Sequence, residues 1–332
     1  MTAAVLGTGS WGTTFASVLA DAGNEVVMWG RSAEVCREIT EQHSNERYLP
    51  GAELSPGISA TGDIRAAVAG ARVVAVAVPS QVLRSVLSGI ADALEPDAVV
   101  VSLMKGVELG SGERMSEVIR EVLDLDDSRV AVVSGPNLAR EIAAHQPTAT
   151  VVAASDERTA AAVAHACATS YFRPYTNTDV VGVELGGAVK NIIALAVGMA
   201  QGAGFGDNTT ATIITRGLAE TTRLGLALGA QPETFAGLAG LGDLVATCAS
   251  RLSRNNTLGR HVGEGMTLGE AVDTTGGTAE GVKSCRAVLE LAAAHGVDMP
   301  ISQAVAAVLY EELPVLTMTE ALLSRPRKAE GH

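Results

Sequence analysis

AAVLGTGSWGTTFASVLADAG, residues 3–23, is the stretch that decides the fold of this chain. Its apolar start predicts a strand, its end predicts a helix, and the pattern G-x-G-x-x-G lies between them. Gly7 would permit the turn, Gly9 would let the backbone approach a pyrophosphate, and Gly12 would allow close packing of the helix. The helix N-terminus would then face the phosphates. The stretch therefore indicates a dinucleotide site, with a site for FMN or for a single phosphate as the alternative.

The chain divides into two halves that differ in their predicted pattern of strands and helices. In the first half, short β-branched runs alternate with helical segments, and residues 73–78 and 99–101 are apolar throughout. Such continuous runs indicate strands buried on both faces, hence a largely parallel sheet. We predict an α/β fold: a Rossmann-like doubly wound parallel sheet over residues 1–178, an all-helical domain over 179–324 and a polar tail over 325–332. The predicted strands are 3–6, 25–29, 72–78, 98–103, 130–134, 148–153 and 171–174. The predicted helices include 11–22, 81–94, 181–200, 209–228, 244–248, 255–263, 267–274, 280–294 and 301–312.

Composition narrows the class of protein. The chain has 332 residues, 47% hydrophobic and 18% charged, which is typical of an ordered protein with two cores. A formal net charge of −13 argues against nucleic acid or an anionic membrane as the main partner. The 4 cysteines lack metal-ligand spacing, which predicts reduced thiols, no metal site and a cytoplasmic location. No signal-peptide pattern opens the sequence. The apolar run after Asn191 stops near Gln201, so we expect it to be too short to span a bilayer and expect no membrane anchor.

The end of the second predicted strand bears on the choice of dinucleotide. A site that prefers NAD usually has an acid there, about 20 residues after the glycines, to bind the ribose 2′-hydroxyl. This chain has MWGRS over residues 28–32, and no carboxylate before Glu34. Arg31 could pair with a 2′-phosphate, or it could be a solvated surface arginine. We predict that NADPH is preferred and that NADH is also accepted.

Lys190 lies in an otherwise apolar stretch of small residues, ELGGAVKNIIALAVG over residues 184–198. Helical spacing places Gly186 and Gly187 one turn before it. An unpaired buried ammonium is costly, and each glycine inside a helix costs about 1 kcal/mol relative to alanine. The pair therefore indicates a close approach, and we expect the two glycines to leave room for substrate or cofactor beside Lys190. The alternative is an edge lysine that reaches back to water.

Other polar residues stand at the ends of predicted strands or the starts of predicted helices. Lys105 follows the strand at 98–103, where it could clamp an anion or be a solvated loop lysine. Asp243 follows a glycine-rich turn and could be a functional carboxylate or an ordinary N-cap. Ser253 can cap the next helix, so Arg254 and Asn255 would form a phosphate site. The alternative there is a capped helix with a surface arginine.

In their order along the chain, these motifs resemble those of bacterial NAD(P)-dependent glycerol-3-phosphate dehydrogenases. The resemblance extends from about residue 3 to about residue 323 and rests on seven segments: 7–12, 105–106, 134–136, 184–191, 240–247, 253–255 and 279–281. It implies an oxidoreductase that interconverts dihydroxyacetone phosphate and sn-glycerol 3-phosphate by hydride transfer with NAD(P)H. It also implies a small-molecule substrate and a supply of glycerol 3-phosphate for phospholipid synthesis. It leaves a homodimer open.

The resemblance also implies roles for individual residues. Lys190 would be the proton donor and acceptor, with its pKa lowered by desolvation and raised again by Asp243. Asn137 stands where the family is expected to have Ser or Thr, so an amide would have to replace a hydroxyl contact. The implied substrate-binding residues are Lys105, Gly135, Asn137, Asp243, Ser253, Arg254 and Asn255. The implied cofactor-binding residues are Gly7, Gly9, Ser10, Trp11, Gly12, Arg31, Tyr48, Lys105, Ala139, Arg254 and Glu280.

Two other classes of protein remain as alternatives. One is a dehydrogenase of the same architecture that acts on a hydroxy acid or sugar acid, with the Ser-Arg-Asn segment holding a carboxylate. The other is a non-catalytic NADPH-binding sensor, which would have no need of Lys190 beside two glycines. A panel of phosphorylated and carboxylated substrates would distinguish the first class from a glycerol-3-phosphate dehydrogenase. Turnover of NADPH would distinguish an enzyme from the second class.

Overall fold

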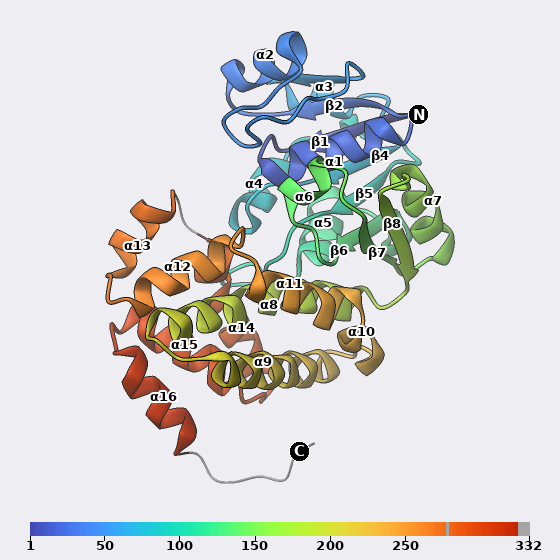
Figure 1. Ribbon diagram of the computed structural model, residues 1–332. Coiled ribbons are helices and arrows are strands. Elements are labelled where there is room, and N and C mark those ends of the chain that lie inside the picture. The colour runs from blue at the N-terminus through green and yellow to red at the C-terminus, as the bar shows by residue number, and fades with distance from the viewer. Residues whose placement is uncertain (277–278, 325–332) are drawn as a thin grey trace.

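The structure is a computed structural model that describes residues 1–276 and 279–324. The N-terminal half forms a sheet with helices on both faces, and the C-terminal half forms a bundle of helices below it (Figure 1). The sheet has eight strands in the order β3-β2-β1-β4-β5-β6-β7-β8. The strands are β1 (Thr2–Leu6), β2 (Glu25–Trp29), β3 (Ile58–Thr61), β4 (Val73–Val76), β5 (Val99–Ser102), β6 (Val130–Ser134), β7 (Thr148–Ala154) and β8 (Phe172–Asn177).

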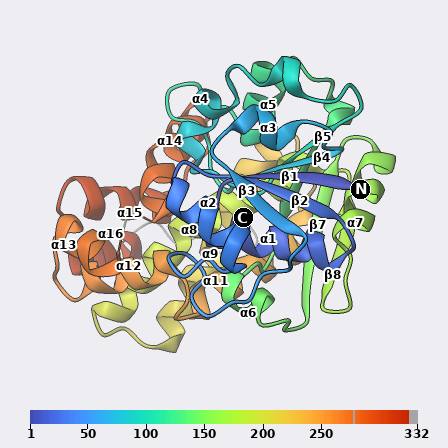
Figure 2. The same ribbon diagram turned by 90° about the horizontal axis from the view of Figure 1, so that it is seen from above.

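The sheet is doubly wound, as the continuous apolar strands predict. All neighbouring strands run parallel except β6 and β7, which are antiparallel. Each face packs into its own apolar core. One face is covered by α1 (Ser10–Asp21), α2 (Ala33–Gln42), α6 (Ala139–Ala143) and α7 (Glu157–Cys167). The other is covered by α3 (Ile64–Val68), α4 (Leu83–Leu87) and α5 (Met115–Leu123). Figure 2 shows the sheet from above, with β1 near its middle.

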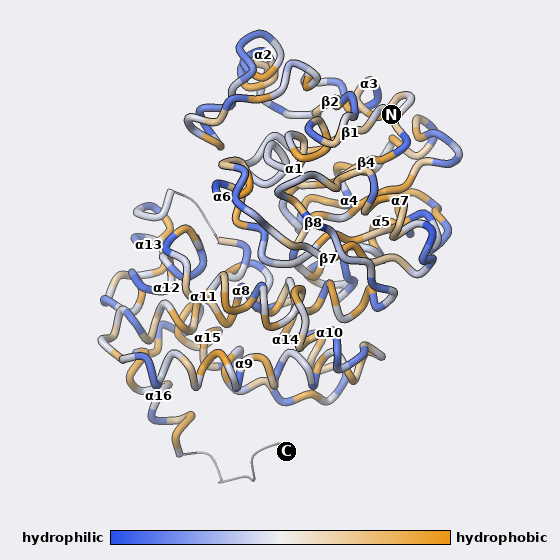
Figure 3. Tube along the Cα trace, turned by 45° about the vertical axis from the view of Figure 1, so that its right-hand side comes forward, coloured by the Kyte–Doolittle hydropathy of each residue, from blue (hydrophilic) through white to orange (hydrophobic). Residues whose placement is uncertain are grey.

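The C-terminal half is helical throughout its described part, and α8 is its central element. α8 lies between helices from both ends of this half, and it contributes more buried side chains to the third apolar core than any other element. In Figure 3 apolar residues predominate along α8, whereas polar residues gather on outer turns such as those around α2. The helices are α8 (Val180–Gly202), α9 (Asp207–Ala227), α10 (Pro232–Ala236), α11 (Asp243–Ala249), α12 (Arg254–Gly263), α13 (Leu268–Thr275), α14 (Glu280–Ala294), α15 (Pro300–Tyr310) and α16 (Val315–Leu323).

Glycines bring α8 and α12 into backbone contact. A Cβ built on Gly198 would lie 2.1 Å from the carbonyl oxygen of Asn256, and one on Gly259 would lie 2.3 Å from that of Leu195. Gly202 and Gly263 repeat the contact one turn further along, at 2.1 and 2.2 Å from carbonyl oxygens of the facing helix. No side chain fits between the two helices at these turns, so the glycine surfaces fix their separation.

The length of α8 corrects one expectation. We expected its apolar run to be too short to cross a bilayer, but the helix has 23 residues and is long and apolar enough to do so. Its most apolar 18-residue window is 89% buried inside the protein. Burial against neighbouring helices accounts for its composition, as it does for the core helix of many folded domains.

Other differences from the predicted elements are local. The edge strand β3 was not predicted. The helix predicted over 81–94 is broken into two short 3₁₀ turns, at Ser80–Val82 and Ala91–Ala93, with α4 between them. The break follows α4 at Gly89, which has φ +89°. The short helices α10 and α16 and a π-helical turn, η4 (Leu238–Gly242), were also not predicted. The predicted tail over 325–332 lies outside the described residues.

Candidate active site

The glycine turn between β1 and α1 has the form expected of a dinucleotide site. Gly7 has φ +127°, and a Cβ on it would lie 2.5 Å from the carbonyl oxygen of Ala77. A Cβ on Gly12 would lie 2.2 Å from the carbonyl oxygen of Gly7, so α1 packs directly on the turn. By contrast, apart from Gly9 itself and its two chain neighbours, no described atom lies within 4 Å of a Cβ built on Gly9. The space beside Gly9, at the start of α1, is therefore open in the way that a pyrophosphate requires.

Several of the other predicted cofactor residues lie around α1. The hydroxyl of Ser10 donates a hydrogen bond to the backbone carbonyl of Tyr48, which brings the loop after α2 to the start of α1. Thr14 donates to the carbonyl of Ala139 at 3.2 Å, which places the start of α6 on the same helix. The indole nitrogen of Trp11 is buried without a hydrogen-bond partner among the described residues.

Two further predicted cofactor residues, Arg31 and Glu280, come from different halves of the chain. Arg31 is exposed and follows the end of β2, where a dinucleotide ribose would be expected. Glu280, at the start of α14 in the helical half, accepts a hydrogen bond from the hydroxyl of Ser80 at 3.0 Å. Because Ser80 follows β4, this bond brings a residue of the helical half to the carboxyl edge of the sheet. Ser80 was not among the predicted site residues.

The centre of the site is one carboxylate between two lysines. The Nζ of Lys190 donates a hydrogen bond to Oδ1 of Asp243, and the Nζ of Lys105 donates to Oδ2 at 2.5 Å. Lys190 also donates to the hydroxyl of Thr247 at 2.7 Å, and Lys105 to the carbonyl of Gly135 at 2.9 Å. Lys190 is 7% exposed and Asp243 is 1% exposed, so the pair is shielded from water. The structure thus joins three predicted residues from different segments.

Burial lowers the pKa of Lys190 from its ordinary value of 10.5 to about 7. Desolvation is the largest cause, the Asp243 carboxylate opposes it, and the nearby charge of Lys105 adds to the lowering. A lysine in this range can both donate and accept a proton near neutral pH. Desolvation and Asp243 therefore have opposite effects on the pKa of Lys190, as expected. Lys105 also affects this pKa, which the sequence pattern did not predict.

Asp243 is not an ordinary N-cap. It is the first residue of α11, directly after the η4 turn, and its carboxylate serves the two lysines rather than its own helix. Thr247 lies one turn further on, and its hydroxyl donates to the backbone carbonyl of Asp243 at 2.7 Å. The four-residue spacing of these two side chains is the signal by which Thr247 could have been added to the predicted site.

The two glycines before Lys190 do not have the role that we expected. A Cβ on Gly186 would lie 2.5 Å from the carbonyl oxygen of Ala239, in η4. A Cβ on Gly187 would lie 2.8 Å from the hydroxyl of Ser134 and 3.3 Å from Cγ of Lys105. Protein atoms therefore fill the space beside both glycines. They make room for the turn that presents Asp243 and for the side chain of Lys105, not for substrate or cofactor.

The predicted phosphate segment begins α12. Ser253 caps the helix, with its hydroxyl accepting from the backbone N–H of Asn256 at 3.2 Å. Arg254 is exposed at this helix start. Asn255 points the other way: its Nδ2 donates to Oδ1 of Asn191 at 3.0 Å, and its Oδ1 accepts from the backbone N–H of Gly281 at 2.9 Å. Asn255 thus ties α12 to the residue after Lys190 and to the start of α14.

Asn137 follows β6 in the loop that also contains Gly135. Its side-chain nitrogen and oxygen are both buried, and neither has a hydrogen-bond partner among the described residues. The hydroxyl of Ser134, the last residue of β6, is also buried and has no hydrogen-bond partner among the described residues. Buried polar atoms are usually hydrogen-bonded, so these groups are free to meet a bound molecule. This is the behaviour expected if the Asn137 amide replaces a hydroxyl contact.

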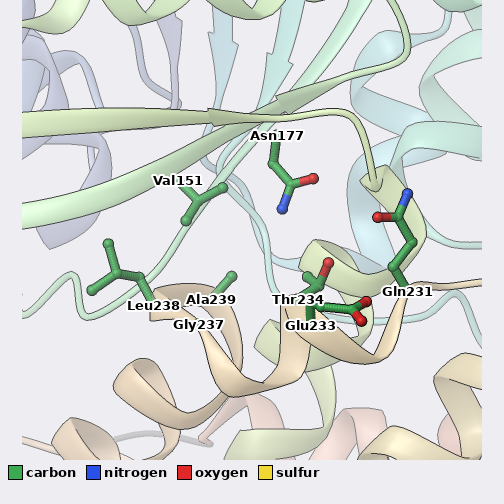
Figure 4. Close-up of a pocket in the computed structure, with 8 residues that line it drawn as sticks. All are labelled: Val151, Asn177, Gln231, Glu233, Thr234, Gly237, Leu238 and Ala239. Carbon is green, nitrogen blue, oxygen red and sulfur yellow. The ribbon is translucent and has the colours of Figure 1, made fainter.

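A separate hollow of about 160 Å³ lies behind η4, between β7, β8 and α10. Figure 4 shows the side chains of Asn177, Gln231 and Glu233 around it. None of the predicted site residues lines it. Within residues 1–276 and 279–324, no group of three His, Cys, Asp or Glu side chains could hold a metal ion.

A glycine-turn dinucleotide fold, with a buried lysine–aspartate pair between it and a helical domain, defines the class: nicotinamide-dependent dehydrogenases that act on an alcohol or a carbonyl compound. Family models agree and are more specific. Residues 2–160 match the N-terminal part of NAD-dependent glycerol-3-phosphate dehydrogenase, and residues 179–320 match its C-terminal part. The chain belongs to the NAD-dependent glycerol-3-phosphate dehydrogenase family.

Individual relatives support this assignment. The glycerol-3-phosphate dehydrogenase [NAD(P)+] of Thermobifida fusca is 60% identical over 330 residues, which cover 99% of this chain and 98% of that protein. A crystal structure of glycerol-3-phosphate dehydrogenase from Coxiella burnetii, 36% identical, covers 98% of this chain and 99% of its own at a TM-score of 0.92. A ketopantoate reductase from Ralstonia eutropha, 18% identical with a TM-score of 0.63, shares the fold alone. The predicted fold, family and NAD(P) dependence are confirmed.

Proposed function

We propose that the Lys105–Asp243–Lys190 cluster catalyses the interconversion of dihydroxyacetone phosphate and sn-glycerol 3-phosphate, with Lys190 as the proton donor and acceptor. The observation that carries the proposal is a buried ammonium with a lowered pKa, held by Asp243 and Thr247 at the contact between the two halves. A soluble sensor would have no need to bury two lysines on one carboxylate, since burying charge is costly.

The chemistry follows from these groups. Bound NAD(P)H supplies the hydride that is added to the substrate carbonyl carbon. Reduction turns the carbonyl oxygen into an alkoxide, which a nearby cation stabilises and protonates. Lys190 donates that proton in reduction and recovers it in oxidation. Asp243 holds Lys190 in place throughout, and the charge of Lys105 keeps the Lys190 proton easy to release.

The substrate phosphate would bind at the start of α12. Arg254 and the N-terminal amides of this helix offer a cation and N–H donors, and Ser253 fixes the helix start. Asn137 and Gly135 would contact the substrate from the sheet. Anchoring the phosphate turns a loose encounter into an oriented one, which is a large part of enzymatic rate acceleration.

The dinucleotide would be held by the glycine turn and by the residues that gather around it. The open space at Gly9 and the free amides at the start of α1 suit its pyrophosphate, and Ser10, Trp11 and Ala139 lie on or against the same helix. Tyr48, Lys105, Arg254 and Glu280 complete the proposed set. The exposed position of Arg31 beyond β2 supports a preference for NADPH over NADH, because a guanidinium can pair with the 2′-phosphate.

A direct assay tests the proposal. NADPH oxidation is followed with dihydroxyacetone phosphate as the substrate. The control substrate is an oxo acid, the compound whose reduction yields a hydroxy acid. We expect turnover with the phosphate substrate, and the Lys190→Ala variant should still bind NADPH but lose kcat by about 10³-fold or more. Near-normal turnover of this variant would exclude Lys190 as the acid.

The remaining assignments follow from family and composition. We propose that the product serves phospholipid synthesis, that the enzyme is cytoplasmic, and that the two domains divide at residues 178 and 179. The 4 free, buried cysteines suit a reducing compartment. A homodimer is also proposed, and sedimentation of the purified chain would test it.

A further inference from the structure

Glu184 is the most deeply buried acid of the site region that the proposed reaction does not use. It lies on α8, two turns before Lys190, and is 5% exposed. Within residues 1–276 and 279–324, all hydrogen-bond partners of its carboxylate belong to the N-terminal half. Oε1 accepts from the backbone N–H of Ser116 at 2.8 Å, and Oε2 accepts from the Ser116 hydroxyl and from Nη1 of Arg114, both at 2.6 Å.

These partners stand at the start of α5, where backbone N–H groups have no partner within the helix. The N–H of Ser116 is one of them, and Glu184 satisfies it from the other half of the molecule. Arg114 is also held by Glu117, at 2.5 Å, so the guanidinium lies between two carboxylates. The result is a buried, charge-assisted tie between α8 and α5.

The segment from Lys105 to Arg114 connects this tie to the reacting lysines. Lys105 starts the segment, and its stem packs on Gly187, one turn after Glu184 on α8. Arg114 ends the segment, and it pairs with Val107 in an isolated antiparallel bridge that closes the loop. The side chain of Val107 is fully buried in the core of the helical half. The loop is thus held against α8 at both of its ends.

The order of contacts along α8 follows from helical spacing. Glu184, Gly187 and Lys190 are three residues apart, so each is adjacent to the next on the helix surface, along a row that winds part of the way around α8. Glu184 holds the end of the loop, Gly187 receives the stem of Lys105, and Lys190 meets Lys105 through the shared carboxylate. A shift of the loop along α8 would therefore change the distance between the two lysines.

We propose that Glu184 is a positioning residue of the reaction: by holding Arg114 and Ser116 on α8, it sets where Lys105 meets the Asp243–Lys190 pair. The inference rests on the proposed catalytic role of Lys190. In chemical terms, Lys105, the second cation of the site, is aligned by the Glu184 carboxylate, which touches neither substrate nor cofactor.

The test compares Glu184→Gln with Glu220→Gln. Glu220 is a matched control because it is also buried and also receives helix N-terminal donors, from Ser302 at 3.2 and 3.1 Å, but within the helical half. Urea unfolding of both variants at the assay pH measures the structural cost of each substitution. Only Glu184→Gln should lower kcat, by about 10- to 100-fold, as expected when a catalytic group is displaced by about 1 Å. Its KM for NADPH should stay unchanged.

A second readout is the pH at which kcat for reduction falls by half. This pH reports the titration of Lys190, whose charged or titratable neighbours are Asp243, Lys105 and Cys248. Displacing Lys105 should move the midpoint upward in Glu184→Gln and leave it in place in Glu220→Gln. If Glu184→Gln does not fold, Ser116→Ala and Arg114→Lys each weaken the same tie, and each should reduce kcat by a smaller factor.

The outcomes separate the two proposals. If Lys190→Ala is inactive while Glu184→Gln matches Glu220→Gln in kcat and pH midpoint, the positioning role is overturned and the proposed function stands. If Lys190→Ala retains turnover, the catalytic assignment fails and the positioning role fails with it.

Discussion

The two adjacent glycines of α8 give the sharpest prediction, because the structure places different obstacles beside them. Each is replaced by alanine in a separate variant. In the interior of a helix this change by itself stabilises the fold by about 1 kcal/mol. The outcome therefore depends on what the added methyl group meets.

At Gly186 the obstacle is backbone. The new Cβ would lie 2.5 Å from the carbonyl oxygen of Ala239 and 3.2 Å from its carbonyl carbon, within the η4 turn. Backbone in a packed turn cannot move aside cheaply, and overpacking of this kind costs about 1–3 kcal/mol. After subtraction of the helix-propensity gain of about 1 kcal/mol, we expect Gly186→Ala to lower the free energy of unfolding by up to about 2 kcal/mol. It should also reduce turnover, because η4 leads into Asp243.

At Gly187 the obstacles are side chains. The hydroxyl of Ser134, 2.8 Å from the new Cβ, has no hydrogen-bond partner among the described residues and can rotate away. The stem of Lys105, at 3.3 Å, would shift by a few tenths of an ångström. We expect Gly187→Ala to stay within about 1 kcal/mol of the wild type in stability, while its kcat falls because Lys105 moves relative to Asp243.

Urea unfolding followed by circular dichroism measures the first quantity, and NADPH oxidation with dihydroxyacetone phosphate measures the second. The reasoning is refuted if Gly187→Ala loses as much stability as Gly186→Ala. It is equally refuted if Gly187→Ala keeps the wild-type kcat, because the methyl group would then leave Lys105 undisturbed.

Four further outcomes are expected. Arg254→Ala should raise the KM for dihydroxyacetone phosphate about 10- to 100-fold, as for loss of a charge-assisted bond, and an unchanged KM would remove it from the phosphate site. Arg31→Asp should shift the ratio of kcat/KM values from NADPH toward NADH; equal ratios in variant and wild type would contradict its role. Because only protonated Lys190 can act as the acid, kcat/KM for reduction should fall as pH rises through about 7, and a flat profile up to pH 9 would argue against it. Burial raises the pKa of Glu220 from 4.5 to about 7. Its contribution to stability is therefore complete below pH 4.5 and is lost as pH rises through about 7, so the free energy of unfolding of the wild type should fall over that range. In Glu220→Gln this fall should be absent.

Local patterns predicted most of the fold because the strands of a buried parallel sheet are apolar at every position. The runs at 73–76 and 99–101 have this pattern, which indicates buried strands. The edge strand β3 escaped prediction because only its first residue is buried, so its sequence has no continuous apolar run. The antiparallel pairing of β6 with β7 depends on the path of the chain between them, which composition does not encode.

The site also has features that local patterns predict and features that they do not. Lys190, Asp243 and Ser253 could be found because each breaks a local pattern or stands at a helix start. The sharing of Asp243 by two lysines could not be found, since Lys105 precedes Asp243 by 138 positions and only the tertiary fold brings them together. The partners of Glu184 could not be found for the same reason, since Arg114 and Ser116 precede it by 70 and 68 positions. The role of Gly187 was misjudged because a sequence does not tell whether the space beside a glycine is taken by ligand or by protein.

The glycine contact between α8 and α12 fixes the distance between two proposed parts of the substrate site. One helix presents the proposed proton donor and the other begins with the proposed phosphate anchor, and backbone touches backbone between them. No intervening side chain can be trimmed or enlarged to change that spacing by small steps. Selection for a substrate with a longer carbon chain would therefore have to slide one helix along the other or replace the anchor altogether. We therefore expect specificity for the length of the substrate carbon chain to depend on the backbone and to resist gradual change.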